Sequence, residues 1–244
     1  MVTPRQSPSG QLIDPVIADT YGFVDDFDVG PSVSGLISTS GSILQTGAGN
    51  WSIRSITNSG SFQGFSAEAD HPGVLRFFTG NTANDAICCT KNQNNISSPG
   101  QIFSEKIDEL EFIFLLQNTS LTTTQVKLFA GALDASFNPT SNLIQLSYDT
   151  SDAVSTSNWV ARMSGATPID TGVRVVPNTT AWWKYRMKRF DEHVELYIND
   201  VLEASFSNPP SGLVSTGFRV QTLAAGNRFI TIDRIALQSK PLNR

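Results

Sequence analysis

Residues 182–206 read WWKYRMKRFDEHVELYINDVLEASF, and this stretch decides the fold. Apolar side chains occupy alternate positions in its two halves: Trp183, Tyr185, Met187, Val194, Leu196 and Ile198. Because successive side chains of a strand point to opposite faces, each half predicts a β-strand with one buried face. Asn199-Asp200 lies between the second half and the next apolar residues, and such a pair favours a two-residue hairpin turn. The stretch therefore predicts three consecutive antiparallel strands.

The same alternation extends outward along the chain. Residues 107–117 form the strongest single pattern, because one face is apolar throughout and the other is acidic only at Glu109 and Glu111. Further short strands are predicted at residues 21–27, 51–56, 74–79, 86–90, 125–132, 143–148, 159–163, 172–176, 217–222 and 229–238. Nowhere does an apolar period of 3.6 persist for three turns. Many short strands without helices predict an all-β sandwich of two antiparallel sheets.

The composition excludes several classes of protein. The chain has 244 residues, of which 39% are hydrophobic and 16% charged, and its polarity comes largely from 28 Ser and 22 Thr. The net charge of −5 argues against non-specific binding of nucleic acid. The apolar runs are shorter than the roughly 18 residues that a membrane helix needs, and because no basic stretch followed by an apolar one opens the sequence, we expect no signal peptide. Cys88 and Cys89 are adjacent, so we expect two free thiols with one of them in the core.

The order of the strands in the second half carries a resemblance. Asn158-Trp159 is followed by the Trp182 strand, then by Val194-Glu-Leu-Tyr-Ile-Asn-Asp-Val-Leu202, and the chain closes with Phe229-Ile-Thr-Ile-Asp-Arg-Ile-Ala-Leu237. This resembles the concanavalin A-like lectin/glucanase jelly roll, in particular the variants found in bacteriophage structural proteins such as head fibres, capsid decorations and tail adhesins. The resemblance covers residues 21–240. It implies one jelly-roll domain over residues 21–244, with the first and last strands side by side.

Residues 1–20 contain three prolines and no periodic pattern. We expect an extended N-terminal arm there, either disordered or laid on a partner, which attaches the protein or mediates oligomerisation.

Glycoside hydrolysis requires two carboxylates that face one cleft. The glucanases that the chain resembles carry Glu-x-Asp-x-x-Glu, and the nearest segment here, Glu105-Lys-Ile-Asp108-Glu109-Leu-Glu111, has the wrong spacing. Glu109 and Glu111 share a face and remain a weak candidate pair, and the alternative is that they are surface charges paired with Lys or Arg. A lyase would need a base such as His71, which lies in a Pro-Gly turn.

Glycan binding needs an exposed aromatic platform beside polar groups. Four aromatic residues are candidates for such a ligand-binding platform, with packing in the core or at its rim as the alternative: Trp51, Tyr148, Trp159 and Trp182. Asp25, Asp26 and Asp28 cluster, but they lack the remaining positions of a calcium-binding loop. We therefore expect no cofactor, and calcium is a minor alternative. Two histidines and two adjacent cysteines do not predict a zinc site.

We therefore expect a non-enzymatic virion protein, in which a jelly-roll module is displayed on the capsid or tail and aids assembly, stabilisation or adhesion. The expected partners are other virion proteins and further copies of this chain, and the protein is made in the host cytoplasm without membrane insertion. A carbohydrate-binding lectin module is the alternative, and it is compatible with a place on a virion. A glycoside hydrolase or lyase that uses Glu109 and Glu111 is the third hypothesis.

Overall fold

The computed structural model describes residues 5–6, 12–13, 22–27, 34–37, 42–46, 49–58, 60–65, 73–91, 102–115, 126–133, 144–175, 182–226 and 228–240. Within these ranges the regular structure is β-strand, apart from one 3-10 turn at Ser104–Lys106. The described residues include no helix long and apolar enough to span a membrane. The described part of the chain is therefore all-β, as the alternating patterns predict.

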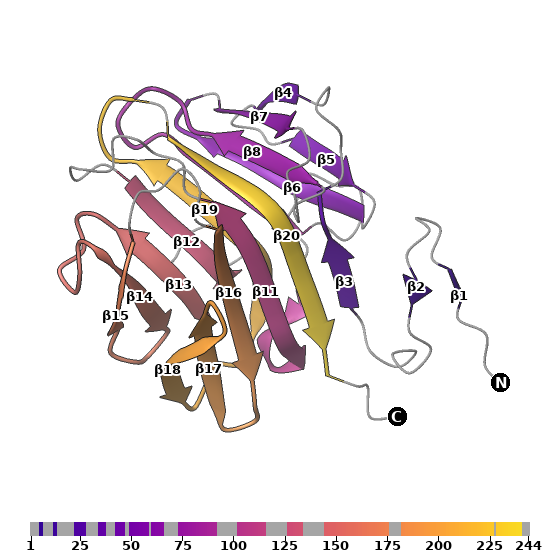
Figure 1. Ribbon diagram of the computed structural model, residues 1–244, viewed down its shortest axis with the longest axis vertical. Coiled ribbons are helices and arrows are strands. Elements are labelled where there is room, and N and C mark those ends of the chain that lie inside the picture. Colours follow the sequence, from indigo (N-terminus) through magenta and orange to yellow (C-terminus); the bar gives the residue numbers. More distant parts are fainter. Residues whose placement is uncertain are drawn as a thin grey trace.

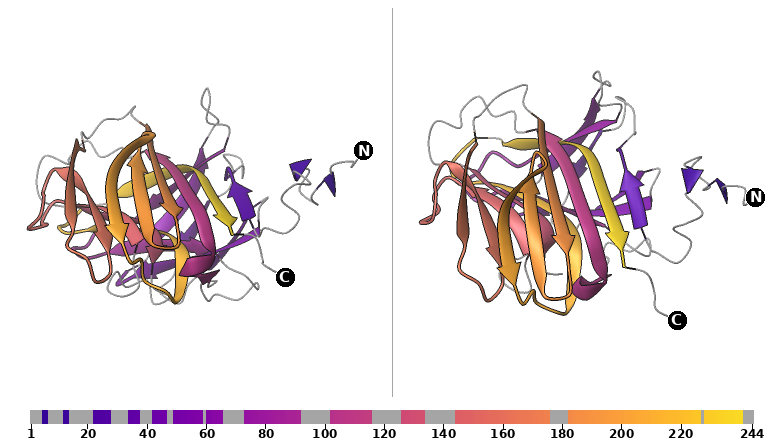
Figure 2. Two further views of the ribbon diagram at one scale, coloured as in Figure 1. Left: turned by 90° about the horizontal axis from the view of Figure 1, so that it is seen from below. Right: turned by 60° about the horizontal axis from the view of Figure 1, so that its bottom comes forward.

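Two large antiparallel sheets hold the described strands from β3 onward (Figure 1). The back sheet runs β15 (Ile169–Arg174), β14 (Asn158–Met163), β13 (Ile144–Asp149), β12 (Val126–Leu133), β19 (Leu213–Thr222), β9 (Ala86–Lys91), β6 (Gly49–Ile56) and β5 (Ser42–Thr46), and β10 (Ile102–Phe103) also pairs with β19. The front sheet runs β18 (Val201–Ser207), β17 (His193–Ile198), β16 (Trp182–Arg189), β11 (Ile107–Leu115), β20 (Phe229–Ser239), β8 (Val74–Phe78), β7 (Gly60–Phe65) and β4 (Ser34–Ile37), and β3 (Gly22–Asp25) also pairs with β20. The sheets stack as two layers (Figure 2), which confirms the predicted sandwich.

The hydrophobic core fills the space between the two sheets. The alternate positions of residues 182–198 that predicted a dry face are all buried: Trp183, Tyr185, Met187, Val194, Leu196 and Ile198. Trp159 of the back sheet lies at the centre of an aromatic cluster, with ring centroids 5.6 Å from Phe114, 5.8 Å from Tyr148 and 5.5 Å from Trp183. Such edge-to-face contacts add to the burial of apolar area, so this cluster joins the two sheets.

The first and last strands of the sandwich pair, as the resemblance implied. In β3 and β20, Asp25 is the register partner of Ile235. The carboxylate of Asp25 accepts hydrogen bonds from the Trp51 indole of the back sheet at 2.6 Å and from the Phe27 backbone N–H at 3.0 Å. A buried carboxylate requires such donors, so this contact fixes the two sheets to each other near the start of the domain.

The strand pattern also shows where the sequence was less informative. The strands β7 and β10 were not predicted, and the Gly/Ser-rich stretch of residues 30–49, whose sequence fits short strands and loops equally, contains strands β4 and β5. Cys88 and Cys89 are free, as expected, but both are buried rather than one. Burial raises the pKa of the Cys88 thiol to about 12, so it is a packed and unreactive group. Of residues 1–20, only β1 (Arg5–Gln6) and β2 (Leu12–Ile13) are described, and the rest of the predicted arm lies outside the described residues.

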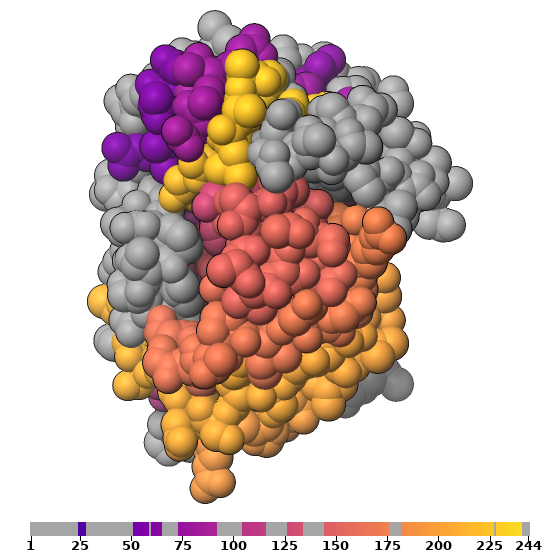
Figure 3. Space-filling model, turned by 90° about the vertical axis from the view of Figure 1, so that its left-hand side faces the viewer, coloured from indigo at the N-terminus to yellow at the C-terminus, as the bar shows by residue number. Residues whose placement is uncertain are grey.

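The outer faces of the two sheets differ. In the front sheet, β16 and β17 alternate between buried and half-exposed positions, as expected for a strand with one face in solvent. In the back sheet, every residue of β9 and β13 is buried, on the outer face as well as on the core face. Figure 3 shows the side on which residues 144–175, in salmon, form a continuous surface with residues 182–215, in orange. The covered outer face of the back sheet is therefore the part of the sandwich to search for a site.

Candidate ligand-binding site

Three of the four candidate platform residues lie inside the protein. Trp51, Trp159 and Tyr148 are 0%, 1% and 3% exposed, respectively. Their rings pack on other core aromatics and cannot offer a face to a sugar, so an exposed platform at these positions is wrong. The physical reason is the large apolar area of these rings, whose burial between the sheets is strongly favourable. Trp182 is half-buried on the outer face of the front sheet, and it remains a candidate.

Glu109 and Glu111 also lie on the outer face of the front sheet. Glu111 is ion-paired with Lys184 at 3.4 Å and with Arg234 at 3.6 Å. Glu109 is ion-paired with Arg186 at 3.9 Å and with Lys188 at 3.5 Å. A glycosidase needs two carboxylates that face one cleft, whereas each of these two carboxylates faces two cationic side chains on the surface of the sheet. The geometry thus fits the alternative of surface charges paired with Lys and Arg.

The acidic cluster near residue 25 is used in other ways. Asp25 is buried and its oxygens accept hydrogen bonds from Trp51 and Phe27, while Asp26 lies 3.8 Å from Arg234. Asp28 and His71 lie outside the described residues. Among the residues whose side chains are described, no three His, Cys, Asp or Glu side chains come together as metal ligands. The calcium alternative therefore has no support from the position of Asp25.

A row of four residues crosses the middle of the back sheet, and we call it the polar strip. Its members are register partners on neighbouring strands: Gln145 of β13, Gly131 of β12, Gly217 of β19 and Thr90 of β9. Their strand neighbours Ile144, Leu146 and Cys89 belong to the core, so the strip lies on the outer face. Four strands at about 4.8 Å spacing place Gln145 roughly 14 Å from Thr90, which is the length of a short oligosaccharide.

The ends of the polar strip carry polar atoms without partners. Gln145 is 1% exposed, and neither its amide nitrogen nor its amide oxygen has a hydrogen-bond partner. The Thr90 hydroxyl is also buried without a partner. Leaving a buried donor or acceptor unpaired costs about 1–3 kcal/mol, so such groups usually serve a purpose other than stability.

The middle of the polar strip is bare backbone. Gly131 has φ +143°, which side chains rarely adopt, and a Cβ atom there would lie 2.4 Å from the Ile144 carbonyl oxygen. A Cβ atom on Gly217 would lie 2.0 Å from the Cys89 carbonyl oxygen. Both positions require glycine because the neighbouring strands approach closely. The consequence is a stretch of backbone without side chains between Gln145 and Thr90.

The residues beside Gln145 on the outer face are joined by hydrogen bonds and ion pairs. Arg162, the register partner of Gln145 on β14, donates from Nε to the Ser147 hydroxyl at 3.0 Å and is ion-paired with Asp152. On the neighbouring strands β12 and β13, Lys127 is ion-paired with its register partner Asp149 at 2.8 Å. Burial opposes ionisation of Asp149, but hydrogen bonds from Lys127 and Ser151 outweigh it and hold its pKa below the ordinary value.

These contacts decide what the polar strip can do chemically. Asp149 and Asp152 are both ion-paired with cations, and the pKa of Asp149 is held below its ordinary value, so Asp149 is not suited to donate a proton to a leaving group. The amide of Gln145 and the hydroxyl of Thr90 are neutral and can both donate and accept. Such neutral groups can hydrogen-bond to a neutral, hydroxyl-rich ligand.

The sequence offered only a weak signal for the polar strip. Gln145, Ser147 and Asp149 alternate with Ile144, Leu146 and Tyr148, so the outer face of β13 was predictable as polar. The row itself joins positions from 90 to 217, and only the strand register brings them together.

Comparison with known proteins places the fold. No family model and no curated protein sequence matches the chain. Among solved structures, a protein of unknown function from Shewanella oneidensis MR-1 has a TM-score of 0.60 at 19% identity, covering 99% of this chain and 97% of that one. The carbohydrate recognition domain of Emp47p has a TM-score of 0.53 at 13% identity, covering 91% of this chain and 96% of that one. The fold is the concanavalin A-like jelly roll.

The glycosidase structures share the architecture only. Trypanosoma rangeli sialidase has a TM-score of 0.52 at 13% identity over 99% of this chain, which spans 34% of the sialidase chain. The catalytic domain LamAcat from Zobellia galactanivorans has a TM-score of 0.50 at 11% identity, covering 88% of this chain and 96% of that one. Lectin and hydrolase structures thus share this fold, and at these identities the likeness concerns the fold alone.

Proposed function

We propose that this protein is a non-enzymatic binding and display module of a bacteriophage particle, built on a jelly-roll sandwich. The observation that carries the non-enzymatic part is the state of the carboxylates. Glu109 and Glu111 on the front sheet and Asp149 and Asp152 on the back sheet are each ion-paired with lysine or arginine. Hydrolysis of a glycosidic bond needs two carboxyl groups that face the bond across one cleft, whereas these four carboxylates each face a lysine or arginine side chain.

The phage setting is supported by the sequence resemblance and by the rigid scaffold with its hydroxyl-rich composition. In this proposal the chain assembles with further copies of itself and with other virion proteins, after synthesis in the host cytoplasm. The test is mass spectrometry of purified virions, together with analytical ultracentrifugation of the isolated protein. We expect the protein in virions and a multimer in solution. A monomer that is absent from particles would refute this setting.

Carbohydrate binding is the second candidate function, and the polar strip favours it. Gln145 and Thr90 are buried, so in this proposal a glycan reaches them only when the cover of this face is displaced; their amide and hydroxyl groups, which lack partners, then hydrogen-bond to sugar hydroxyls above the glycine backbone. A glycan array probed with the wild type should give signals that are lost in Gln145→Met. The matched control is Gln221→Met, because Gln221 lies on the same face but already has partners in Arg219 and Asn84. An array without signals, or equal signals from all three proteins, would argue against this function.

A further inference from the structure

The front sheet ends in a strand that has a neighbour on one side. β18 pairs with β17, and among the described strands no other pairs with it. In Figure 1 it lies beside β17 in the lower part of the view. Every second residue of such an edge strand directs its backbone N–H and C=O groups away from the sheet, where they can pair with a further strand.

The sequence of β18 does little to protect this edge. Edge strands usually carry lysine, proline or a bulge that discourages pairing. β18 has no lysine, arginine or proline, and Glu203 is its one charged residue. A bulge does occur at Glu203, which is left out of the register with β17, but residues 204–207 after it pair regularly. A regular edge of four residues is therefore open to pairing.

Large apolar side chains are exposed at both ends of β18. At its start, Val201 and Leu202 are 58% and 49% exposed, the two largest values among the large apolar side chains that the structure describes. At its other end, Phe190 is 42% exposed and stacks on His193, with ring centroids 4.3 Å apart. His193 is the register partner of Ser207, the last residue of β18.

These two apolar ends lie on the same face of the sheet. Leu202 is the register partner of Tyr197, and Tyr197 shares its parity along β17 with His193. Both residues of β17 are half-buried, as is typical of the outer face. The outer face along this edge therefore carries Leu202 at one end and the Phe190–His193 stack at the other.

We propose that β18 is an interface at which two copies of this chain pair as antiparallel strands about a two-fold axis. Two-fold pairing reverses each strand against its copy, so the start of one β18 meets the end of the other. When Ser205 faces its copy, Leu202 of each chain lies just beyond Ser207 of the other. Its backbone is then about two strand spacings, roughly 10 Å, from that of the partner's His193, so the exposed apolar groups of the two copies meet.

The charge of the edge fits the same register. Glu203 of one copy lies opposite Ser207 of the other, a hydroxyl that can donate to the carboxylate, and the register partner of Ser207 is His193 rather than an acid. The two Glu203 carboxylates are kept apart, which matters because like charges directly opposite each other destabilise strand pairing. A second copy is therefore a complementary occupant of this edge.

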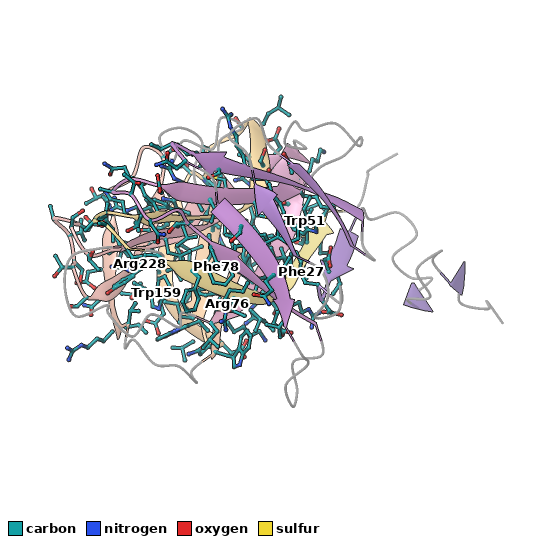
Figure 4. All side chains as sticks on the ribbon, turned by 90° about the horizontal axis from the view of Figure 1, so that it is seen from above. Phe27, Trp51, Arg76, Phe78, Trp159 and Arg228 are labelled. Atoms are coloured by element: carbon teal, nitrogen blue, oxygen red, sulfur yellow. The ribbon has the colours of Figure 1, made fainter. Side chains whose placement is uncertain are left out.

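The size of the edge sets the strength that we expect. β18 has seven residues, which is about 23 Å of strand, and β15 at the edge of the back sheet contacts it. Large aromatic rings, which anchor tight interfaces, lie inside the sandwich: Trp159, labelled in Figure 4, is 1% exposed. We therefore expect a dimer with a Kd of about 10 µM rather than nanomolar. This inference rests on the assembly of further copies proposed above, and it names the strand that joins them.

The test is sedimentation velocity of the full chain at concentrations on both sides of the expected Kd. The variants are Ser205→Glu and Ser205→Lys, because Ser205 is exposed and its replacement leaves the core intact. Gln238→Lys is the matched control, since Gln238 is exposed on the same sheet but has β11 on one side and β3 on the other. Thermal unfolding by circular dichroism verifies that each variant is folded.

We expect the wild type and Gln238→Lys to dimerise with the same Kd. Ser205→Glu and Ser205→Lys should each weaken dimerisation by at least about fourfold, which is the effect of two like charges about 5 Å apart in water. An equimolar mixture of the two variants should recover the dimer, because opposite charges then face each other across the axis. High salt should reduce both effects.

Three outcomes would overturn the inference. A wild type that stays monomeric well above the expected Kd has no such interface, and mass spectrometry of virions then decides separately whether the protein belongs to a particle. A multimer with the same affinity in the wild type and both Ser205 variants has its interface elsewhere, and the proposed assembly survives. A dimer that Ser205→Lys strengthens would place the introduced lysine against Glu203 of the other copy, and the register proposed here would be wrong.

Discussion

Replacing Gln145 by methionine should make the protein more stable while abolishing ligand binding at the polar strip. The side chain is 1% exposed, and both of its amide atoms lack hydrogen-bond partners. In the unfolded chain the amide is hydrated, so folding loses those hydrogen bonds without replacing them. Methionine has a similar length and flexibility but carries no such polar group, and its burial is favourable.

The magnitude follows from the cost of burying an unpaired polar group, which is about 1–3 kcal/mol. We expect Gln145→Met to raise the free energy of unfolding by this amount, which corresponds to roughly 2–4 °C in Tm for each kcal/mol in a chain of this size. Urea unfolding followed by tryptophan fluorescence measures the difference, provided that the m-value is unchanged.

Gln221→Met is the control for this experiment. The Gln221 amide accepts a hydrogen bond from Arg219 at 2.9 Å and donates to Asn84 at 3.3 Å, so its replacement loses contacts and should be neutral or destabilising. If Gln145→Met destabilises the protein as much as Gln221→Met does, the Gln145 amide is satisfied in solution. The reasoning that assigns the polar strip to a ligand would then be refuted.

Other predictions concern the two sheets and their contacts. Asp25→Ala should remove the acceptor of buried donors such as the Trp51 indole, and each such donor costs about 1–3 kcal/mol of the free energy of unfolding. A loss of less than about 1 kcal/mol in urea unfolding would contradict this prediction. Gly217→Ala should destabilise by about 1–3 kcal/mol or more, because a Cβ would meet the neighbouring strand at 2.0 Å; an unchanged Tm would be the opposing result. The pKa of Asp149 is lowered in the fold, so its stabilising effect is present above the unfolded pKa of about 3.9 and is lost as the pH falls through the folded pKa. Between pH of about 5 and about 2 the wild type should therefore lose more stability than Asp149→Asn, and parallel losses would show that the fold does not lower the pKa of Asp149.

The sequence determined the strands and the side of each strand that faces the core. The period of two is a local property, since steric alternation places neighbouring side chains on opposite faces whatever the rest of the chain does. For this reason we could predict without a structure which positions of residues 182–198 are buried. We could also predict that Glu109 and Glu111 lie on the same face of their strand. Parity also separated Trp182, which is half-exposed, from Trp183, which is in the core.

The alternation of side chains along a strand does not predict what covers a face of the sheet, or which distant residues are register partners. Tyr148 shares its parity with Ile144 and Leu146 and could have been assigned to the core, but Trp159 lies in a strand whose two faces both carry apolar residues. The partnership of Gln145 with Thr90 through two glycines depends on the register of four strands that are far apart in the chain. Local sterics set each strand, whereas the complementary packing of two whole sheets sets the register, and only that register assembles the candidate sites.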